Sequence, residues 1–86
     1  MALPVNFEAE VFTTSTGTYK DKEGTDREYY SVTVIDSVSG TVAKLSCDSA
    51  DTLNDCEVLK REVCEFSAEY NPDYKTLRVV GVRPLA

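Results

Sequence analysis

Histidine and tryptophan are absent from this chain of 86 residues, and glycine, proline and cysteine are scarce. Without histidine there is no Ser-His or Cys-His nucleophile pair, and most catalytic zinc sites are excluded. The glycines form neither a P-loop nor a dinucleotide-binding fingerprint. The acids between Asp21 and Asp26 lack the spacing of a calcium-binding EF-hand loop. We therefore expect no enzyme, no cofactor and no metal site, but a protein that acts by binding.

The sequence also lacks a long apolar run. Its first residues show no basic cluster followed by apolar residues, so we expect neither a signal peptide nor a membrane span. The three cysteines, Cys47, Cys56 and Cys64, are odd in number and form no C-x-x-C pair. Cysteines in this pattern suit a reducing compartment. We predict a cytoplasmic protein whose thiols are reduced and structural.

Basic residues are few, and the net charge is −6. Binding to phosphates depends mainly on Lys and Arg, so the total charge argues against a nucleic-acid partner. However, the stretch from Asp48 to Glu69 has seven acids and two bases, whereas residues 70–86 have three bases and one acid. A face outside the acidic stretch can therefore be neutral or positive. In the alternative interpretation, the acids only keep a small protein soluble.

Apolar residues alternate with polar ones along most of the chain, which is typical of half-buried strands. This pattern predicts strands over residues 5–11, 27–35, 41–47, 62–70 and 74–82. After Ser49, a candidate N-cap, a weak helical pattern with Leu53 and Cys56 on one face predicts a short helix of one or two turns. Residues 13–26 are polar and are predicted to form a long exposed loop or a hairpin wing. Three strands, a short helix and two strands are the layout of the OB-fold, a five-stranded Greek-key barrel. We predict an all-β, OB-fold-like domain over residues 1–86, with an SH3-like barrel as the alternative. The predicted core is Val5, Phe7, Val32, Val34, Leu45, Phe66, Leu77 and Val79.

Tyrosines next to basic residues provide the candidate binding site. Single-strand binding needs aromatic faces for stacking of bases and cations for the backbone. The OB-fold binds its ligands on strands two and three and in the loops that join strands one to two and four to five. Tyr30 is ambiguous, because the strand phase predicts that it points into the core. The predicted nucleic-acid-binding residues are Tyr19, Lys20, Lys22, Arg27, Tyr29, Tyr30, Lys44 and Tyr74.

Several motifs resemble those of the gene V type single-stranded DNA-binding proteins of filamentous phages. Phe12-Thr13-Thr14 followed by Gly17 resembles the entry to that family's DNA-binding wing. Tyr30-Ser31 before an apolar strand resembles the exit from the wing, and Tyr74 resembles the aromatic residue at the tip of its last hairpin. Pro84 after an Arg near the end of the chain is also similar.

The resemblance implies an OB-fold homodimer that coats single-stranded DNA during phage, plasmid or conjugative-element replication. The family's binding roles would fall on Lys20, Lys22, Arg27, Tyr30 and Tyr74. This chain departs from the family at Ser15 and Thr16, where an early basic residue is expected, and in its longer, more acidic wing. We expect the last hairpin, residues 70–75, to form the dimer contact. The sequence leaves open RNA in place of DNA. The alternative function is an acidic protein–protein interaction module that binds no nucleic acid.

Overall fold

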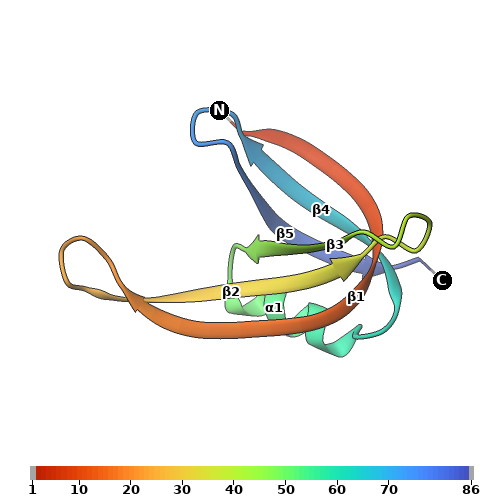
Figure 1. The fold of residues 1–86 in the computed structure, drawn as a ribbon, viewed down its shortest axis with the longest axis horizontal. Helices are drawn as coiled ribbons and strands as arrows, with labels where there is room; N and C mark the ends of the chain where they lie inside the picture. Colours follow the sequence, from red (N-terminus) through yellow and green to blue (C-terminus); the bar gives the residue numbers. More distant parts are fainter. Residues whose placement is uncertain (1, 86) are drawn as a thin grey trace.

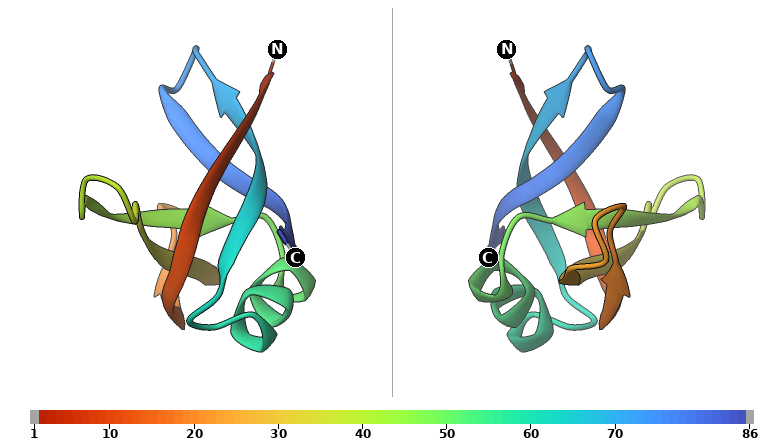
Figure 2. Two further views of the ribbon diagram at one scale, coloured as in Figure 1. Left: turned by 90° about the vertical axis from the view of Figure 1, so that its right-hand side faces the viewer. Right: turned by 90° about the vertical axis from the view of Figure 1, so that its left-hand side faces the viewer.

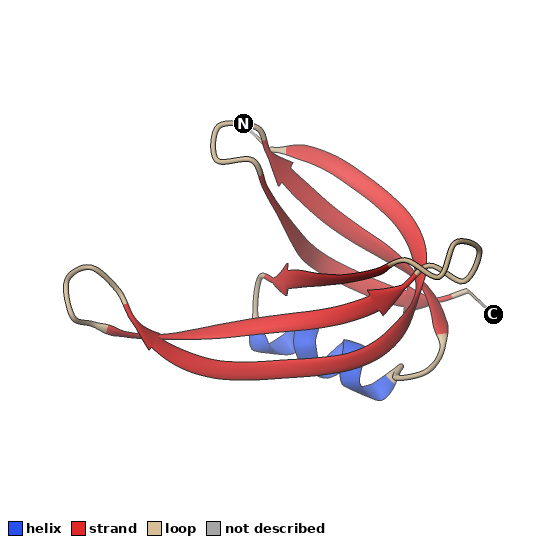
Figure 3. Ribbon diagram, viewed as in Figure 1, coloured by secondary structure: helices blue, strands red, loops and turns tan. Residues whose placement is uncertain are grey.

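The computed structural model of the protein describes residues 2–85. It contains five strands and one helix, drawn in Figures 1 and 3, in the order β1 (Leu3–Lys20), β2 (Asp26–Ile35), β3 (Val42–Cys47), α1 (Ala50–Val58), β4 (Val63–Asn71) and β5 (Thr76–Pro84). The predicted all-β class is confirmed, as is a short helix between the third and fourth strands. No helix in residues 2–85 is long and apolar enough to cross a membrane.

The five strands form one sheet with the neighbour order β1-β2-β3-β5-β4, and pairing of β4 with β1 closes it into a barrel. The β3–β5 pair is parallel, and the other four pairs are antiparallel. Figure 2 shows α1 at one end of the sheet and the β4–β5 turn at the other. The helix therefore covers one end of the barrel and leaves the β4–β5 turn exposed.

Strand β1 is long because it pairs with two partners in succession. Its first half pairs with β4 and its second half with β2, and a bulge between Val11 and Thr13 interrupts the register. The segment after α1 bonds to this point of the strand: Arg61 N donates to the Val11 carbonyl at 2.7 Å, and Val11 N donates to the Glu62 carbonyl at 3.1 Å. The Arg61 guanidinium lies 4.9 Å from the centre of the Phe12 ring. A bulge bends a strand and increases its twist, so β1 can leave the barrel here.

Residues 13–26 form a hairpin wing, which resolves the alternative left open by the sequence. Strand β1 continues to Lys20 and β2 begins at Asp26, with continuous pairing from Thr13 to Lys20. Figure 1 shows this wing projecting from the rest of the barrel. Threonine is frequent here, and its β-branched side chain favours extended backbone.

The core contains Val32, Val34, Phe66 and Val79, as predicted. Phe66 stacks on Phe7 of the neighbouring strand, with ring centres 5.1 Å apart. The other four predicted core residues, Val5, Phe7, Leu45 and Leu77, are only half-buried. Phe7, Leu45 and Leu77 line an apolar hollow of about 430 Å³ beside the β2–β3 turn, so the core is open to solvent on that side.

Ser49 caps the N-terminus of α1, as the sequence predicted. Its hydroxyl accepts a hydrogen bond from Thr52 N at 3.3 Å, and the buried Thr52 hydroxyl donates to Asp48 at 2.6 Å. The helix spans nine residues, slightly more than the one or two turns that the weak pattern indicated. Cys47, Cys56 and Cys64 are free and buried, and they fill the space between the helix and the barrel.

Candidate functional site

The turn at the tip of the wing is organised by one carboxylate, that of Asp21. Its Oδ1 accepts hydrogen bonds from Glu23 N and Thr25 N, both at 2.9 Å. Its Oδ2 accepts from Arg27 Nε at 3.0 Å, and these hydrogen bonds, that of Arg27 first, hold the pKa of Asp21 below its usual value. Lys20 similarly pairs with Asp26 at 3.1 Å. Two of the predicted binding bases, Lys20 and Arg27, are therefore already paired with acids of the wing.

Tyr19 and Tyr29 lie on the same outward face of the wing. Tyr19 pairs with Arg27 and Gly17 with Tyr29, and directly paired residues share a face of the sheet. A Cβ atom added at Gly17 would come within 2.5 Å of the Tyr29 ring, so this ring lies over the glycine. The exposed fractions are 52% for Tyr19 and 40% for Tyr29. Both rings can therefore be reached by a ligand.

Tyr30 lies on the opposite face of β2 and packs against the core, where the strand phase placed it. Its hydroxyl donates to the Glu28 carboxylate, and this hydrogen bond raises the pKa of Tyr30. Tyr30 also lines a pocket of about 280 Å³ between the wing, the end of β3 and β5. We call this the Tyr29 pocket; its lining residues are Tyr19, Glu28, Tyr29, Tyr30, Ser46, Cys47, Asp48 and Arg78.

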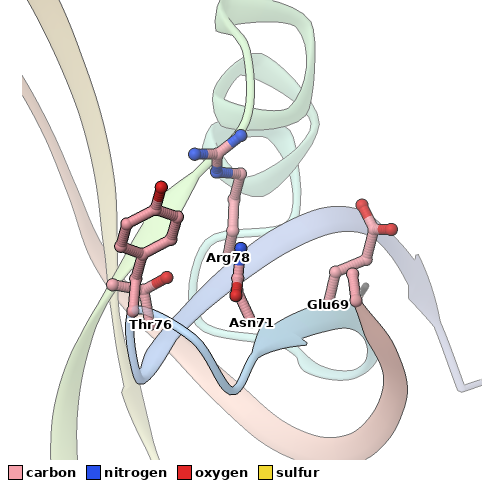
Figure 4. A pocket seen from close by; sticks show the side chains of 6 residues that line it. Glu69, Asn71, Thr76 and Arg78 are labelled. Carbon is pink, nitrogen blue, oxygen red and sulfur yellow. The ribbon is translucent and has the colours of Figure 1, made fainter.

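Tyr74 is at the turn between β4 and β5 and is 77% exposed. The turn is fixed locally: the Asn71 side chain accepts from Asp73 N at 2.9 Å, and Lys75 has a left-handed φ of 53°. Tyr74 borders a second pocket, of about 470 Å³, which Figure 4 shows. We call it the Tyr74 pocket; its lining residues are Ala2, Glu69, Asn71, Tyr74, Thr76 and Arg78.

Arg78 lines both pockets, so the two pockets are neighbours, and we call them together the groove. On β5 it is next to Ser46 of β3 and directly opposite Glu69 of β4. No ion pair joins Arg78 to Glu69 among the described residues, and Figure 4 shows the two side chains standing apart. Arg78 was not among the predicted site residues, because no tyrosine neighbours it in the sequence and it lies within a strand. The signal was present in strand phase, since Arg78 alternates with the inward-facing Leu77 and Val79.

The Lys and Arg side chains fall into two groups: those that pair with another side chain of the protein and those that are free to contact a ligand. Lys20, Arg27, Lys60 and Arg83 form ion pairs with acids, and Arg61 lies over Phe12. Within residues 2–85, the bases without such a partner are Lys22, Lys44, Lys75 and Arg78. Lys22 is at the wing tip, Lys75 is beside Tyr74, and Lys44 is on the outward face of β3, two residues before Ser46. The available bases thus lie on the elements that border the groove.

Comparisons of the chain with protein-family models, with curated proteins and with solved structures found no match.

The groove therefore has to be interpreted from its own chemistry. It presents exposed phenol rings for stacking and the guanidinium of Arg78 for anionic groups, together with the carboxylates of Glu28, Asp48 and Glu69. No group of three or more His, Cys, Asp or Glu that could hold a metal ion is found in the described part of the chain. Of the eight predicted site residues, Tyr19, Tyr29, Tyr30 and Tyr74 line the groove directly, whereas Lys20, Lys22, Arg27 and Lys44 lie outside its two pockets.

Proposed function

We propose that the chain is an OB-fold that binds single-stranded DNA in the groove between the wing and the β4–β5 turn. The strand order of the closed sheet, the parallel β3–β5 pair and the position of α1 after β3 support this assignment. An OB-fold binds its ligand on strands two and three and in the loops that join strands one to two and four to five. Here Tyr29 lies on β2, Tyr74 lies in the β4–β5 loop, and Tyr19 lies at the end of β1 next to the β1–β2 turn.

The observation that carries the proposal is that exposed tyrosine rings and Lys or Arg side chains without an ion-pair partner occur on the same elements. The chain as a whole is acidic, yet the basic side chains without an ion-pair or ring partner in residues 2–85 lie at the wing tip, on β3, in the β4–β5 turn and on β5, the elements that carry or neighbour the three exposed tyrosines. Stacking on an aromatic ring contributes about 1–3 kcal/mol per base and tolerates any sequence, since every base has a π-face. Cations beside such rings then bind the phosphates that join successive bases.

In this mechanism stacking contributes more to affinity than charge does. A single strand releases about 0.7 counterion for each phosphate contact. Contacts from three or four Lys or Arg side chains therefore give a salt slope of about −2 to −3. Such a shallow slope predicts binding that persists into moderate salt. Glu28, Asp48 and Glu69 reduce the local positive potential further. The chain should therefore depend on its tyrosines more than a basic single-strand-binding protein does.

The biological role we propose follows the resemblance to the gene V type proteins. The chain coats or protects single-stranded DNA during replication of a phage, plasmid or conjugative element, and acts as a homodimer in the cytoplasm. The wing observed at residues 13–26 and the exposed Tyr74 at the last hairpin are the structural features that support this role.

Replacement of Tyr74 tests the proposal. Loss of one stacking ring should weaken binding by about fivefold to a hundredfold, equivalent to about 1–3 kcal/mol. Fluorescence anisotropy of a labelled oligo(dT) at low salt measures the change between the wild-type protein and Tyr74→Ala. Leu85→Ala is the matched control, because Leu85 is also exposed but lies outside the groove.

Absence of wild-type binding to DNA or RNA oligonucleotides at low salt would contradict the proposal. The acidic protein–protein interaction module would then be the better explanation of the chain. Equal binding by the wild-type protein and by both Tyr29→Ala and Tyr74→Ala would show instead that the nucleic acid lies on another face.

A further inference from the structure

The Tyr29 pocket contains a guanidinium and a carboxylate that do not pair with each other. Arg78 and Asp48 both line it, and no ion pair between them is present among the described residues. Asp48 is held in position by the neighbouring elements. Its backbone N donates to the Val79 carbonyl at 2.9 Å, and its Oδ1 accepts from the Thr52 hydroxyl at 2.6 Å.

The second carboxylate oxygen of Asp48, Oδ2, accepts no hydrogen bond from the described residues. A carboxylate repels the phosphates of a nucleic acid. The favourable contact it can make in a nucleic-acid-binding groove is to accept hydrogen bonds from the N–H groups of a base. The Arg78 guanidinium has the opposite chemistry, because it can only donate. A ligand that satisfies both residues must therefore offer acceptors and donors along its edges.

Guanine fits this combination best among the four bases. Its O6 and N7 accept a bidentate pair of hydrogen bonds from an arginine, which is the commonest specific arginine–base contact. Its N1–H and N2 amino group can donate together to one carboxylate. Cytosine offers only its N4 amino group as a donor. The pocket volume of about 280 Å³ is also at the lower end for ligand sites, which suits a single base.

We propose that the Tyr29 pocket selects guanine, with Asp48 and Arg78 contacting its edges and Tyr29 or Tyr19 stacking on its face. This inference rests on the proposed function and adds a base preference to it. Binding along the rest of the groove remains independent of sequence, and guanine marks the preferred register of the strand on the protein.

The test compares four labelled 15-mers: oligo(dT), and oligo(dT) with one central dG, dC or deoxyinosine. A good bidentate contact discriminates between bases by about fivefold to a hundredfold, so the dG strand should bind tighter than oligo(dT) by a factor in this range. Deoxyinosine lacks the N2 amino group and should lose part of the gain. The dC strand should stay within about threefold of oligo(dT), since it donates only once.

Asp48→Asn should reduce the ratio of dG-strand to oligo(dT) affinity to nearly one. Asp51→Asn is the matched control and should preserve the ratio, because Asp51 is in the first turn of α1, just after Asp48 and the Ser49 cap, but does not line the pocket. Thermal melting of both variants checks that the helix N-terminus is intact. Arg78→Lys should also lower the ratio, because lysine keeps the charge but not the bidentate geometry.

Each outcome has a separate meaning. Tight oligo(dT) binding with no preference for dG overturns the guanine inference and leaves single-strand binding intact. No binding of any strand overturns both proposals. Competition by free dGMP at concentrations near those of the oligonucleotide would show a mononucleotide site, and would overturn the assignment of the pocket to a base within a strand.

Discussion

The Tyr29 ring occupies the space that a side chain at residue 17 would need. Added at Gly17, a Cβ atom would lie 2.5–2.7 Å from three atoms of the ring, which is closer than van der Waals contact allows. Because Gly17 has no side chain, the ring of Tyr29 on the neighbouring strand can pack directly over it. This packing favours one position of the Tyr29 ring before a ligand binds, so less conformational entropy is lost on binding.

Gly17→Ala should therefore weaken oligo(dT) binding although residue 17 carries no binding group. The added methyl displaces the Tyr29 ring, so the loss should approach that of Tyr29→Ala, about fivefold to a hundredfold. The double variant should bind no more weakly than Tyr29→Ala alone, because both changes act on the same ring. Ser15→Ala, two residues earlier on the same face, is the control. Wild-type affinity of Gly17→Ala combined with weak binding of Tyr29→Ala would contradict this account.

At the scale of elements, the tip of the wing depends on the ionised form of Asp21. Its hydrogen bonds from Arg27, Thr25 and Glu23 favour the carboxylate and lower its pKa below the ordinary 3.8. A group with a depressed pKa in the folded state contributes its stabilisation above the unfolded pKa, and loses it as the pH falls through the folded pKa. The turn should therefore stay ordered at neutral pH and loosen only in strong acid.

NMR titration of the Arg27 Nε–H resonance measures this directly. The resonance should shift with a midpoint below pH 3.8, and Asp21→Asn should abolish the transition. Asp26→Asn, which removes the partner of Lys20 instead, should leave it in place. A midpoint at or above the ordinary value for aspartate would show that the Asp21–Arg27 contact does not form in solution.

The core allows a similar test, because the barrel is well filled near α1 and open beside the β2–β3 turn. Leu45 is inward-facing but borders the apolar hollow. Truncation of a fully buried leucine costs about 2–5 kcal/mol, so Leu45→Ala should cost about 1–2 kcal/mol in the monomer. Urea denaturation measures the free energy of unfolding. A cost above about 3 kcal/mol would mean that the hollow is covered in solution.

The alternation of apolar residues was sufficient to predict five strands and the buried Val32, Val34, Phe66 and Val79, and the cap at Ser49 predicted the helix position. It could not predict which end of the barrel stays open, because Leu45 and Leu77 have the same phase as the buried residues. Arg78 was missed for a related reason. Its role depends on the β3–β5 pairing, which brings together residues far apart in the sequence.

At the scale of the whole molecule, a small acidic chain leaves apolar area uncovered. In the open hollow, Ala43 of β3 is exposed, and Leu45 and Leu77 are only half-buried. A chain of this length buries only about 60–65% of its unfolded surface, so association with a second copy would stabilise it. The homodimer implied by the resemblance therefore has a physical reason.

Light scattering at micromolar concentrations and above should give twice the chain mass of 9.5 kDa. The hairpin at residues 70–75 was the contact expected from the sequence, but DNA binding requires Tyr74 to remain accessible. Ala43→Asp should therefore lower the dimer fraction, because it introduces a charge into the apolar hollow that Ala43 lines, whereas Tyr74→Ala should leave the mass unchanged. A monomer mass for the wild-type protein at every concentration would contradict the prediction.

A backbone-amide NMR titration of the wild-type protein with unlabelled oligo(dT) at low salt shows directly which surface binds single-stranded DNA. Binding in the groove should shift the amides of Tyr19, Tyr29, Ser46, Tyr74 and Arg78. The amides of α1 from Asp51 to Glu57 should stay unchanged, because that helix is acidic and lies outside the groove. The absence of any shift, or shifts confined to α1, would contradict single-strand binding in this groove.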